Sequence, residues 1–187
     1  MDTALDIFRL MMRDEIAPEL RRMGFKGSGQ SFILPSETHW VLLGFQKSRA
    51  SNAEFVLFTV NVTAVSKRTW IEARSERSYV PERPSPNSNY GPWAWQQRIG
   101  HLLPDRQDKW WTVDIRASME SVKVEVLEEV LDAIRTYALP AIEQQVAQSL
   151  GKAESTSGDI REHWGTKGFA PCSTRRIRLE RASSIAT

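Results

Sequence analysis

The sequence FVLFTVNVTAV, residues 55–65, is the stretch that decides the fold. Its side chains alternate between two faces, as they do in a β-strand, where successive side chains point to opposite sides. One face is apolar and consists of Val56, Phe58, Val60, Val62 and Ala64. The other face becomes polar toward its end and consists of Phe55, Leu57, Thr59, Asn61 and Thr63. The pattern predicts a strand in the middle of a sheet that buries one face in a core.

Four further strands are expected around this one. The run Trp40–Lys47 is apolar until its end, which predicts a strand covered on both faces over much of its length. Ser31–Leu34 is a shorter candidate before it, after a flexible turn at residues 27–29. Strands around Trp95–Ile99 and over Trp110–Ile115 follow later in the chain. Because the turns between the strands are short, antiparallel pairing is favoured.

An amphipathic helix is expected before the strands. Apolar residues recur every three or four positions from Leu5 to Met23 and form one stripe. Thr3 and Asp6 resemble a capping box at its start. Pro18 should kink the helix or restart it, and Gly24 should stop it.

A second and longer helix is expected from about Ser118 to Ser149. Its apolar face runs from Val122 to Ile142 at helical spacing. Pro140 should bend this helix, because the hydrogen bond to the Thr136 carbonyl is lost, and the helix should end at Gly151.

This order of elements predicts an α+β fold in two layers. A mainly antiparallel sheet of about five strands would carry the N- and C-terminal helices on one face. The opposite face would be open, or covered by the loop of residues 75–92, which is polar and holds four prolines. Residues 1–150 would form this single domain, and residues 151–187 a basic, disordered tail.

The charge distribution supports this division. The 187-residue chain has a net charge of +2, with 18 basic and 19 acidic residues in 1–150 but 7 basic and 4 acidic in 151–187. Four tail arginines could contact RNA or DNA phosphates. A solvated tail explains them better, so nucleic-acid binding ranks last among the hypotheses. These arginines are Arg175, Arg176, Arg178 and Arg181.

The sequence shows no sign of export or of membrane insertion. The N-terminus lacks the basic start and apolar core of a signal peptide. No apolar run approaches the ~20 residues needed to span a bilayer. The only cysteine, Cys172, excludes an intramolecular disulfide and fits a reducing compartment. We therefore expect a cytoplasmic protein without a membrane partner.

Several short motifs follow one another in an order and spacing that resemble a known family. They are Leu20–Lys26, Phe32, Gly44–Ser48, Phe58–Val62, Arg98–Gly100 with Leu102, Trp110–Trp111 and Leu139–Pro140. Over roughly residues 5–150 the chain resembles the bacterial family catalogued as domain of unknown function 4304. The resemblance implies a bacterial α/β sandwich without an assigned activity, and it supplies no catalytic residues to carry over.

The chemistry-bearing residues do not indicate a catalytic or metal site. His39, His101 and His163 are far apart in the sequence, and Cys172 has no neighbouring ligand, whereas zinc sites use closely spaced pairs. No Gly-x-Ser-x-Gly elbow is present. We therefore expect no metal, no cofactor and no catalytic residue, and whether the protein is an enzyme stays open, with the balance against it.

Polar residues within the strands are more informative. Gln46 ends an apolar strand and Asn61 lies inside another, and buried amides need hydrogen-bond partners. With Arg98 and Trp111 they could form a binding pocket on the sheet face. The alternative is structural: Gln46 and Asn61 would then satisfy neighbouring backbone at a sheet edge or bulge.

Aromatic residues cluster beside the proline-rich loop. Tyr90, Trp93 and Trp95 could form an exposed patch that contacts a partner, since aromatic residues often anchor protein interfaces. The alternative is that they belong to a core.

These features favour a small protein-binding module, with an immunity or toxin-neutralising role as one form. A small-ligand-binding protein or an enzyme that uses the pocket around Gln46, Asn61, Arg98 and Trp111 is the alternative. The oligomeric state cannot be read from the sequence.

Overall fold

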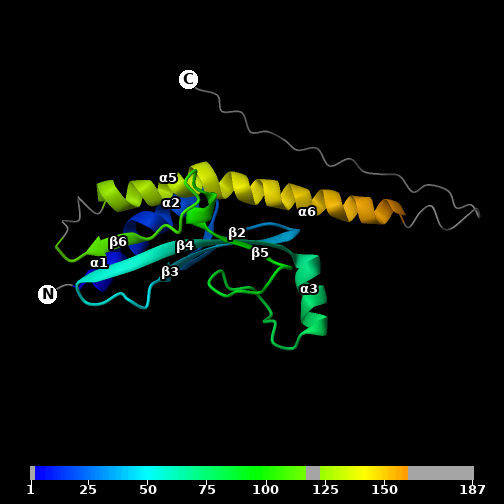
Figure 1. Cartoon of the computed structure of the whole chain (residues 1–187), viewed down its shortest axis with the longest axis horizontal. Coiled ribbons are helices and arrows are strands. Elements are labelled where there is room, and N and C mark those ends of the chain that lie inside the picture. The colour runs from blue at the N-terminus through cyan, green and yellow to red at the C-terminus, as the bar shows by residue number, and fades with distance from the viewer. Residues whose placement is uncertain (1–2, 117–122, 160–187) are drawn as a thin grey trace, which may run out of the picture.

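The fold is α+β, as the sequence predicts. A computed structural model describes residues 3–116 and 123–159 (Figure 1). In these residues, six strands form one antiparallel sheet, and the N- and C-terminal helices lie together on one face of it. The strands are β1 (Lys26–Ser28), β2 (Ser31–Leu34), β3 (His39–Lys47), β4 (Phe55–Ser66), β5 (Trp95–Arg98) and β6 (Trp111–Asp114).

β4 is the central strand of this sheet. β3 pairs with one side of it along nine residues of each strand. The other side is shared by two short strands. β6 pairs with the first part of β4, where Trp111 lies opposite Phe58, and β5 pairs with the last part, where Arg98 lies opposite Asn61. One strand therefore sets the relative positions of three others.

The main core lies between the sheet and the helices. Phe58 is fully buried there, with its ring centroid 5.1 Å from that of Phe8 and 5.7 Å from that of Trp111. Full burial of such a side chain contributes about 1.5–3 kcal/mol. The apolar face predicted for residues 55–65 is confirmed, because Val56, Phe58, Val60 and Val62 all belong to this core.

The N-terminal helical segment begins with the predicted capping box. The Thr3 hydroxyl accepts a hydrogen bond from the Asp6 N–H at 3.3 Å, and the Asp6 carboxylate accepts one from the Thr3 N–H at 3.0 Å. These bonds satisfy backbone donors that the first helical turn leaves without partners. Three parts follow: α1 (Ala4–Leu10), a π-helical turn η1 (Met11–Ile16) and α2 (Ala17–Arg22).

The two helix-breaking prolines occupy equivalent positions. Pro18 is the second residue of α2, directly after η1, and Pro140 is the second residue of α6 (Leu139–Asp159), directly after the π-helical turn η4 (Ile134–Ala138). A π-helical turn bonds each N–H to a carbonyl five residues back, so the helix can restart around a residue that has no N–H to donate. The sequence predicted a kink or a restart at Pro18, and the structure has a change from a π-helical turn to α2 directly before this residue.

The C-terminal helical segment runs through η3 (Lys123–Leu127), α5 (Glu128–Ala133), η4 and α6. Val130, Ile134 and Ile142 are buried in the main core, as predicted. The predicted end at Gly151 is wrong, since α6 continues to Asp159. A single helical glycine costs only about 1 kcal/mol relative to alanine, which good helix formers on both sides can offset. The predicted start near residue 118 and the tail beyond 159 lie outside the described residues.

The second face of the sheet is covered by α3 (Lys67–Glu76) and the loop of residues 77–94, which lie below the sheet in Figure 1. Trp70 of α3 is 1% exposed, and its indole N–H donates to the Pro81 carbonyl at 3.1 Å. Around it, Val65, Val80 and Ala94 form a second, smaller core. The sequence left this face open or covered by the loop, and the structure lies between the two: α3 and the loop cover part of it and leave the rest open.

One strand was not expected from the sequence. Residues 26–28 form β1, which pairs with β2 in a hairpin, whereas residues 27–29 were interpreted as a flexible turn. Gly27 has a φ of +137°, and a Cβ at this position would clash with the Ser31 carbonyl. The glycine that made the segment look like a connector is thus what permits the close hairpin.

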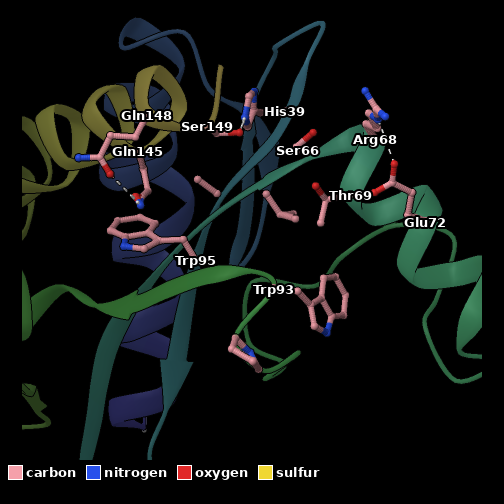
Figure 2. Close-up of a pocket in the computed structure, with 13 residues that line it drawn as sticks. His39, Ser66, Arg68, Thr69, Glu72, Trp93, Trp95, Gln145, Gln148 and Ser149 are labelled. Carbon is pink, nitrogen blue, oxygen red and sulfur yellow. Dashed lines mark hydrogen bonds and ion pairs between the residues drawn. The ribbon is translucent and has the colours of Figure 1, made fainter. Parts of the chain in front are cut away.

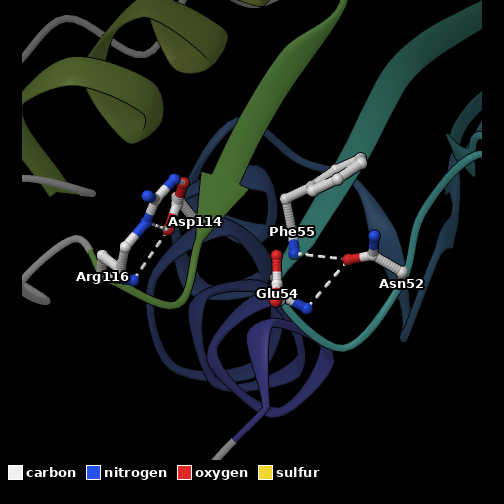
Figure 3. Close-up of polar contacts among 5 residues, drawn as sticks. All are labelled: Asn52, Glu54, Phe55, Asp114 and Arg116. Carbon is white, nitrogen blue, oxygen red and sulfur yellow. Dashed lines mark hydrogen bonds and ion pairs between the residues drawn. The ribbon is translucent and has the colours of Figure 1, made fainter.

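The ends of β4 and β6 lie side by side where Phe55 pairs with Asp114, and each end has its own local hydrogen bonds (Figure 3). The Asn52 side chain accepts hydrogen bonds from the Glu54 and Phe55 N–H groups, at 2.8 and 3.0 Å. On β6, the carboxylate of Asp114 accepts hydrogen bonds from the side chain and the N–H of Arg116, which lower the pKa of Asp114 to about 2. This exposed pair helps stability above the ordinary aspartate pKa of 3.8, and that help is lost as the pH falls toward 2.

A substitution at Gly44 of β3 tests how closely the loop of residues 77–94 packs on the sheet. A Cβ at residue 44 would be 2.8 Å from the Pro86 Cβ and still closer to the Asn87 side-chain oxygen. We expect Gly44→Ala to lower the free energy of unfolding by roughly 1–3 kcal/mol, because of overpacking. Hydrogen exchange over residues 77–94 should become faster. Gly151→Ala is the control, since its added methyl meets open space. Unchanged exchange in the loop of Gly44→Ala would contradict the close contact.

Candidate functional site

Three of the four residues predicted to form a polar pocket lie together. The Asn61 amide donates hydrogen bonds to the Gln46 side-chain oxygen at 2.8 Å and to the Asn87 side-chain oxygen at 2.9 Å. Together with Arg98 and Gln96, these residues line an open hollow of about 460 Å³ on the second face of the sheet. Their polar groups converge because 46, 61 and 98 occupy the same face of neighbouring strands.

Trp111, the fourth predicted residue, lies on the opposite face. It pairs with Phe58 of β4, whose side chain faces the helices. Trp111 is 3% exposed, and its indole N–H donates to the Glu129 carboxylate at 3.0 Å. The sequence did not reveal this, because residues on separate strands can be assigned to one face only when the pairing register is known.

Arg98 lies at the edge of the polar hollow and already has partners. Its guanidinium is 2.7 Å from the Asp108 carboxylate and lies over the Trp110 ring, 5.1 Å from the ring centroid. The Arg98 side chain is 37% exposed. It is therefore held in place by a carboxylate and an aromatic ring while part of it remains accessible to a ligand or partner.

Gln96 joins the loop to the sheet. Its amide donates to the Ser88 carbonyl at 2.6 Å and to the Thr63 hydroxyl at 3.3 Å, and its side-chain oxygen accepts from the Tyr90 N–H at 3.0 Å. The loop is thus anchored by amide side chains that also line the hollow, so its position and the shape of the hollow depend on each other.

Of the two possibilities that the sequence left open for these aromatic residues, an exposed patch or a core, the packing in the structure fits the core. Tyr90 and Trp93 are half-buried against Trp70, with ring centroids 4.8 and 5.1 Å away. Trp95 packs against the main core instead. The alternation along β5 separates Trp95 from Gln96 and Arg98, which face the other side.

A second hollow, also of about 460 Å³, lies between α3 and α6 (Figure 2). Trp93 and Trp95 both border it, so the two tryptophans share a cavity although they belong to different clusters. On the α3 side Arg68 is paired with Glu72 at 3.0 Å. The α6 side contributes three polar residues, Gln145, Gln148 and Ser149.

His39 lies on this second hollow and is 3% exposed. One ring nitrogen shares a hydrogen bond with the Thr38 hydroxyl at 2.8 Å. The other shares one with the hydroxyl of Ser149, which lies beside His39 in Figure 2, at 2.9 Å. Burial lowers the pKa of His39, because the charged ring would lose water. No local pattern indicates this contact, since Ser149 is 110 residues away from His39.

A third hollow, of about 670 Å³, joins the other two. It lies between β5 and α6 and shares Trp95, Gln145 and Gln148 with the second hollow. It shares Gln97 and His101 with the first. We call the surface formed by these three hollows the β5 surface.

The described residues contain no group of three or more histidine, cysteine, aspartate or glutamate side chains that could hold a metal ion. They also contain no helix that is both long and apolar enough to cross a bilayer. His163, Cys172 and the four tail arginines lie outside the described part of the chain.

The burial of His39 should make stability depend on pH. Above the ordinary histidine pKa of 6.5, the ring is neutral in both folded and unfolded chains. As the pH falls below that value, the unfolded chain binds a proton at residue 39 and the folded chain does not. The free energy of unfolding therefore decreases as the pH falls below 6.5. The decrease stops once the pH is below the lowered pKa that His39 has in the folded chain.

We expect wild type to lose stability relative to His39→Gln between about pH 7 and pH 5, the range in which histidine titrates. Urea unfolding of both proteins across this range measures the difference. A difference that stays constant with pH would contradict a lowered pKa at His39.

Comparison with known proteins gives one match. A family model described as "Domain of unknown function (DUF4304)" matches residues 16–144, which is more than half of the chain. No curated protein and no solved structure matches. The matched range includes all of the sheet, α3 and the first part of α6. The chain therefore belongs to the DUF4304 family, as the motifs in its sequence indicated.

Proposed function

We propose that this protein is a recognition module that binds a partner protein through the β5 surface. The observation that carries the proposal is the continuity of this surface: three hollows adjoin one another along a single strand and share residues. A concave surface of this kind can bury many side chains of a partner at once.

The composition of the β5 surface supports protein binding. Nine asparagine or glutamine side chains line it, together with Trp93 and Trp95. Two of its three arginines, Arg68 and Arg98, are already ion-paired within the protein. Interface centres are depleted in free charge and enriched in aromatic residues and arginine, so this lining suits an interface better than a site for a highly charged ligand.

Side chains rather than backbone supply the recognition. β5 is the last strand on its side of the described sheet, and β4 is its only neighbour there. It is only four residues long, which limits the pairing of a foreign strand at this edge. The tryptophans and amides on both faces of β5 offer a larger and more specific contact. A toxin is one class of partner, and the protein would then act as an immunity protein.

A second candidate function is the binding of a small polar ligand in the hollow above Asn61. The convergence of amides favours it: Gln46, Asn61 and Asn87 line this hollow, and the Asn61 amide donates to the side-chain oxygens of the other two at 2.8 and 2.9 Å. A ligand bound by Gln46 and Asn61 would need amide or hydroxyl groups that can both donate and accept.

A positive charge placed on the side of α6 that lines the β5 surface tests protein binding. We expect Gln148→Arg to lose the partner, with affinity reduced roughly 30-fold or more, as for a residue at the centre of an interface. Ala147→Arg adds the same charge to the same helix at an exposed position that borders none of the hollows, and it should bind as wild type does.

The measurement is affinity purification of each tagged variant from the native cell, followed by titration of the recovered partner. Equal recovery with Gln148→Arg, or the absence of any stoichiometric partner of wild type, would refute protein binding at the β5 surface. Asn61→Leu distinguishes the second candidate function from the first. It should abolish small-ligand binding, while the α6 residues that line the β5 surface stay unchanged.

A further inference from the structure

A separate hollow lies beside the N-terminal helices. It has a volume of about 480 Å³ and is bordered by α1, η1, α2, the β1–β2 turn and the end of β3. It shares no residue with the β5 surface. Whatever this hollow binds can therefore be tested independently of the proposed protein partner.

Four cations surround this hollow, and no acidic residue lines it. They are Arg9, Arg13, Arg21 and Lys47. Residues 1–150 contain almost equal numbers of basic and acidic residues, so this grouping is a local feature. Cations gathered around a concave surface raise the local concentration of anions.

The four cations are only partly neutralised within the protein. Arg9 and Arg13 pair with Asp6 and Asp14, but their side chains are 67% and 71% exposed, and exposed pairs of this kind are weak. Arg21 donates to the Gly27 carbonyl at 3.1 Å. Among the described residues, neither Arg21 nor Lys47 forms an ion pair with a carboxylate. Positive charge is therefore available to a bound anion.

The floor of the hollow is apolar. Phe8, Met12 and Ala17 line it, and each is no more than 3% exposed and belongs to the main core. Leu5 adds a half-buried side chain at the edge. An apolar group placed here displaces water from hydrocarbon, and the flexible methionine side chain can adapt to its shape.

We propose that this hollow binds a small molecule with an apolar body and one carboxylate or phosphate group. The apolar body lies over Phe8 and Met12, and the anionic group meets Lys47 and the arginines. A purely polar anion leaves the floor unused, and an uncharged or cationic molecule leaves the cations unused. Both parts of the ligand are therefore required.

Calorimetric titration with three probes tests this requirement. Decanoate carries a nine-carbon alkyl chain and a carboxylate and should bind at one saturable site. Acetate lacks the body and decyltrimethylammonium has the opposite charge, so each should bind at least roughly tenfold more weakly. Decanoate affinity should fall as salt is added, because the cations are exposed. Absence of saturable decanoate binding, or equal affinity for decyltrimethylammonium, would overturn the proposal.

Substitutions locate the site. The double variant Arg13→Gln with Lys47→Gln should bind decanoate about tenfold or more weakly, as expected when charge-assisted contacts are lost. Arg74→Gln removes a cation from an exposed position on α3 and should bind as wild type does. Thermal unfolding of both variants checks that they fold. Wild-type affinity in the double variant would contradict the assignment.

Methionine methyl NMR provides a readout that does not depend on these variants. Of the five methionines, Met12 lines the hollow. Its methyl resonance, assigned with Met12→Leu, should move on addition of decanoate. If the Met11 and Met23 methyl resonances shift and the Met12 resonance does not, the proposed location is refuted.

The source of the ligand is either a free molecule or a membrane lipid, and the two share the same chemistry. Sedimentation with phosphatidylglycerol vesicles distinguishes them. If wild type sediments with the vesicles and the double variant does not, the ligand is a lipid headgroup. If wild type binds decanoate but does not sediment with the vesicles, the ligand is a free amphipathic acid. Failure of both arms in wild type would overturn the proposal and would leave the β5 surface untouched.

Discussion

The structure depends on the burial of β4 on both faces. Phe58 and Val62 face the helices and Val65 faces α3, and all three are almost completely buried. A strand covered in this way cannot slip by one residue, because a slip would exchange its two faces. β3, β5 and β6 all pair with β4, so its register fixes theirs. The hollows inherit their geometry from this one strand.

The two proposed sites follow from the two layers that β4 separates. On the helix side, the N-terminal helices pack on the main core. The hollow that is lined by Arg9, Arg13, Arg21 and Lys47 lies beside them. On the other side, α3 and the loop 77–94 cover only part of the sheet, and the amides of Gln46, Asn61 and Gln96 fill the remaining surface. Amides suit this place because they can anchor the loop and still offer hydrogen bonds outward. Recognition of a protein and binding of a small amphipathic anion can therefore coexist in one protein.

Local patterns in the sequence were sufficient for much of the fold. The alternation in residues 55–65 and the capping box at Thr3 each depend on near neighbours in the chain, and the structure confirms them. Features that depend on distant residues were missed or misplaced. Trp111 was assigned to the pocket although its register with Phe58 turns it to the other face. His39 gave no signal because its partner, Ser149, belongs to the last helix. Gln46, Asn61 and Arg98 do lie together, but their common face follows from the pairing register, which the sequence did not show.

Native-state hydrogen exchange of β4 tests the central claim most directly. If β4 holds both layers together, the amides of residues 58–63 should exchange only through global unfolding, with an opening free energy equal to the free energy of unfolding measured by denaturant. Amides of α3 and of the loop 77–94 should open at lower free energy. Exchange of residues 58–63 through a partial opening, while α3 stays protected, would contradict the account.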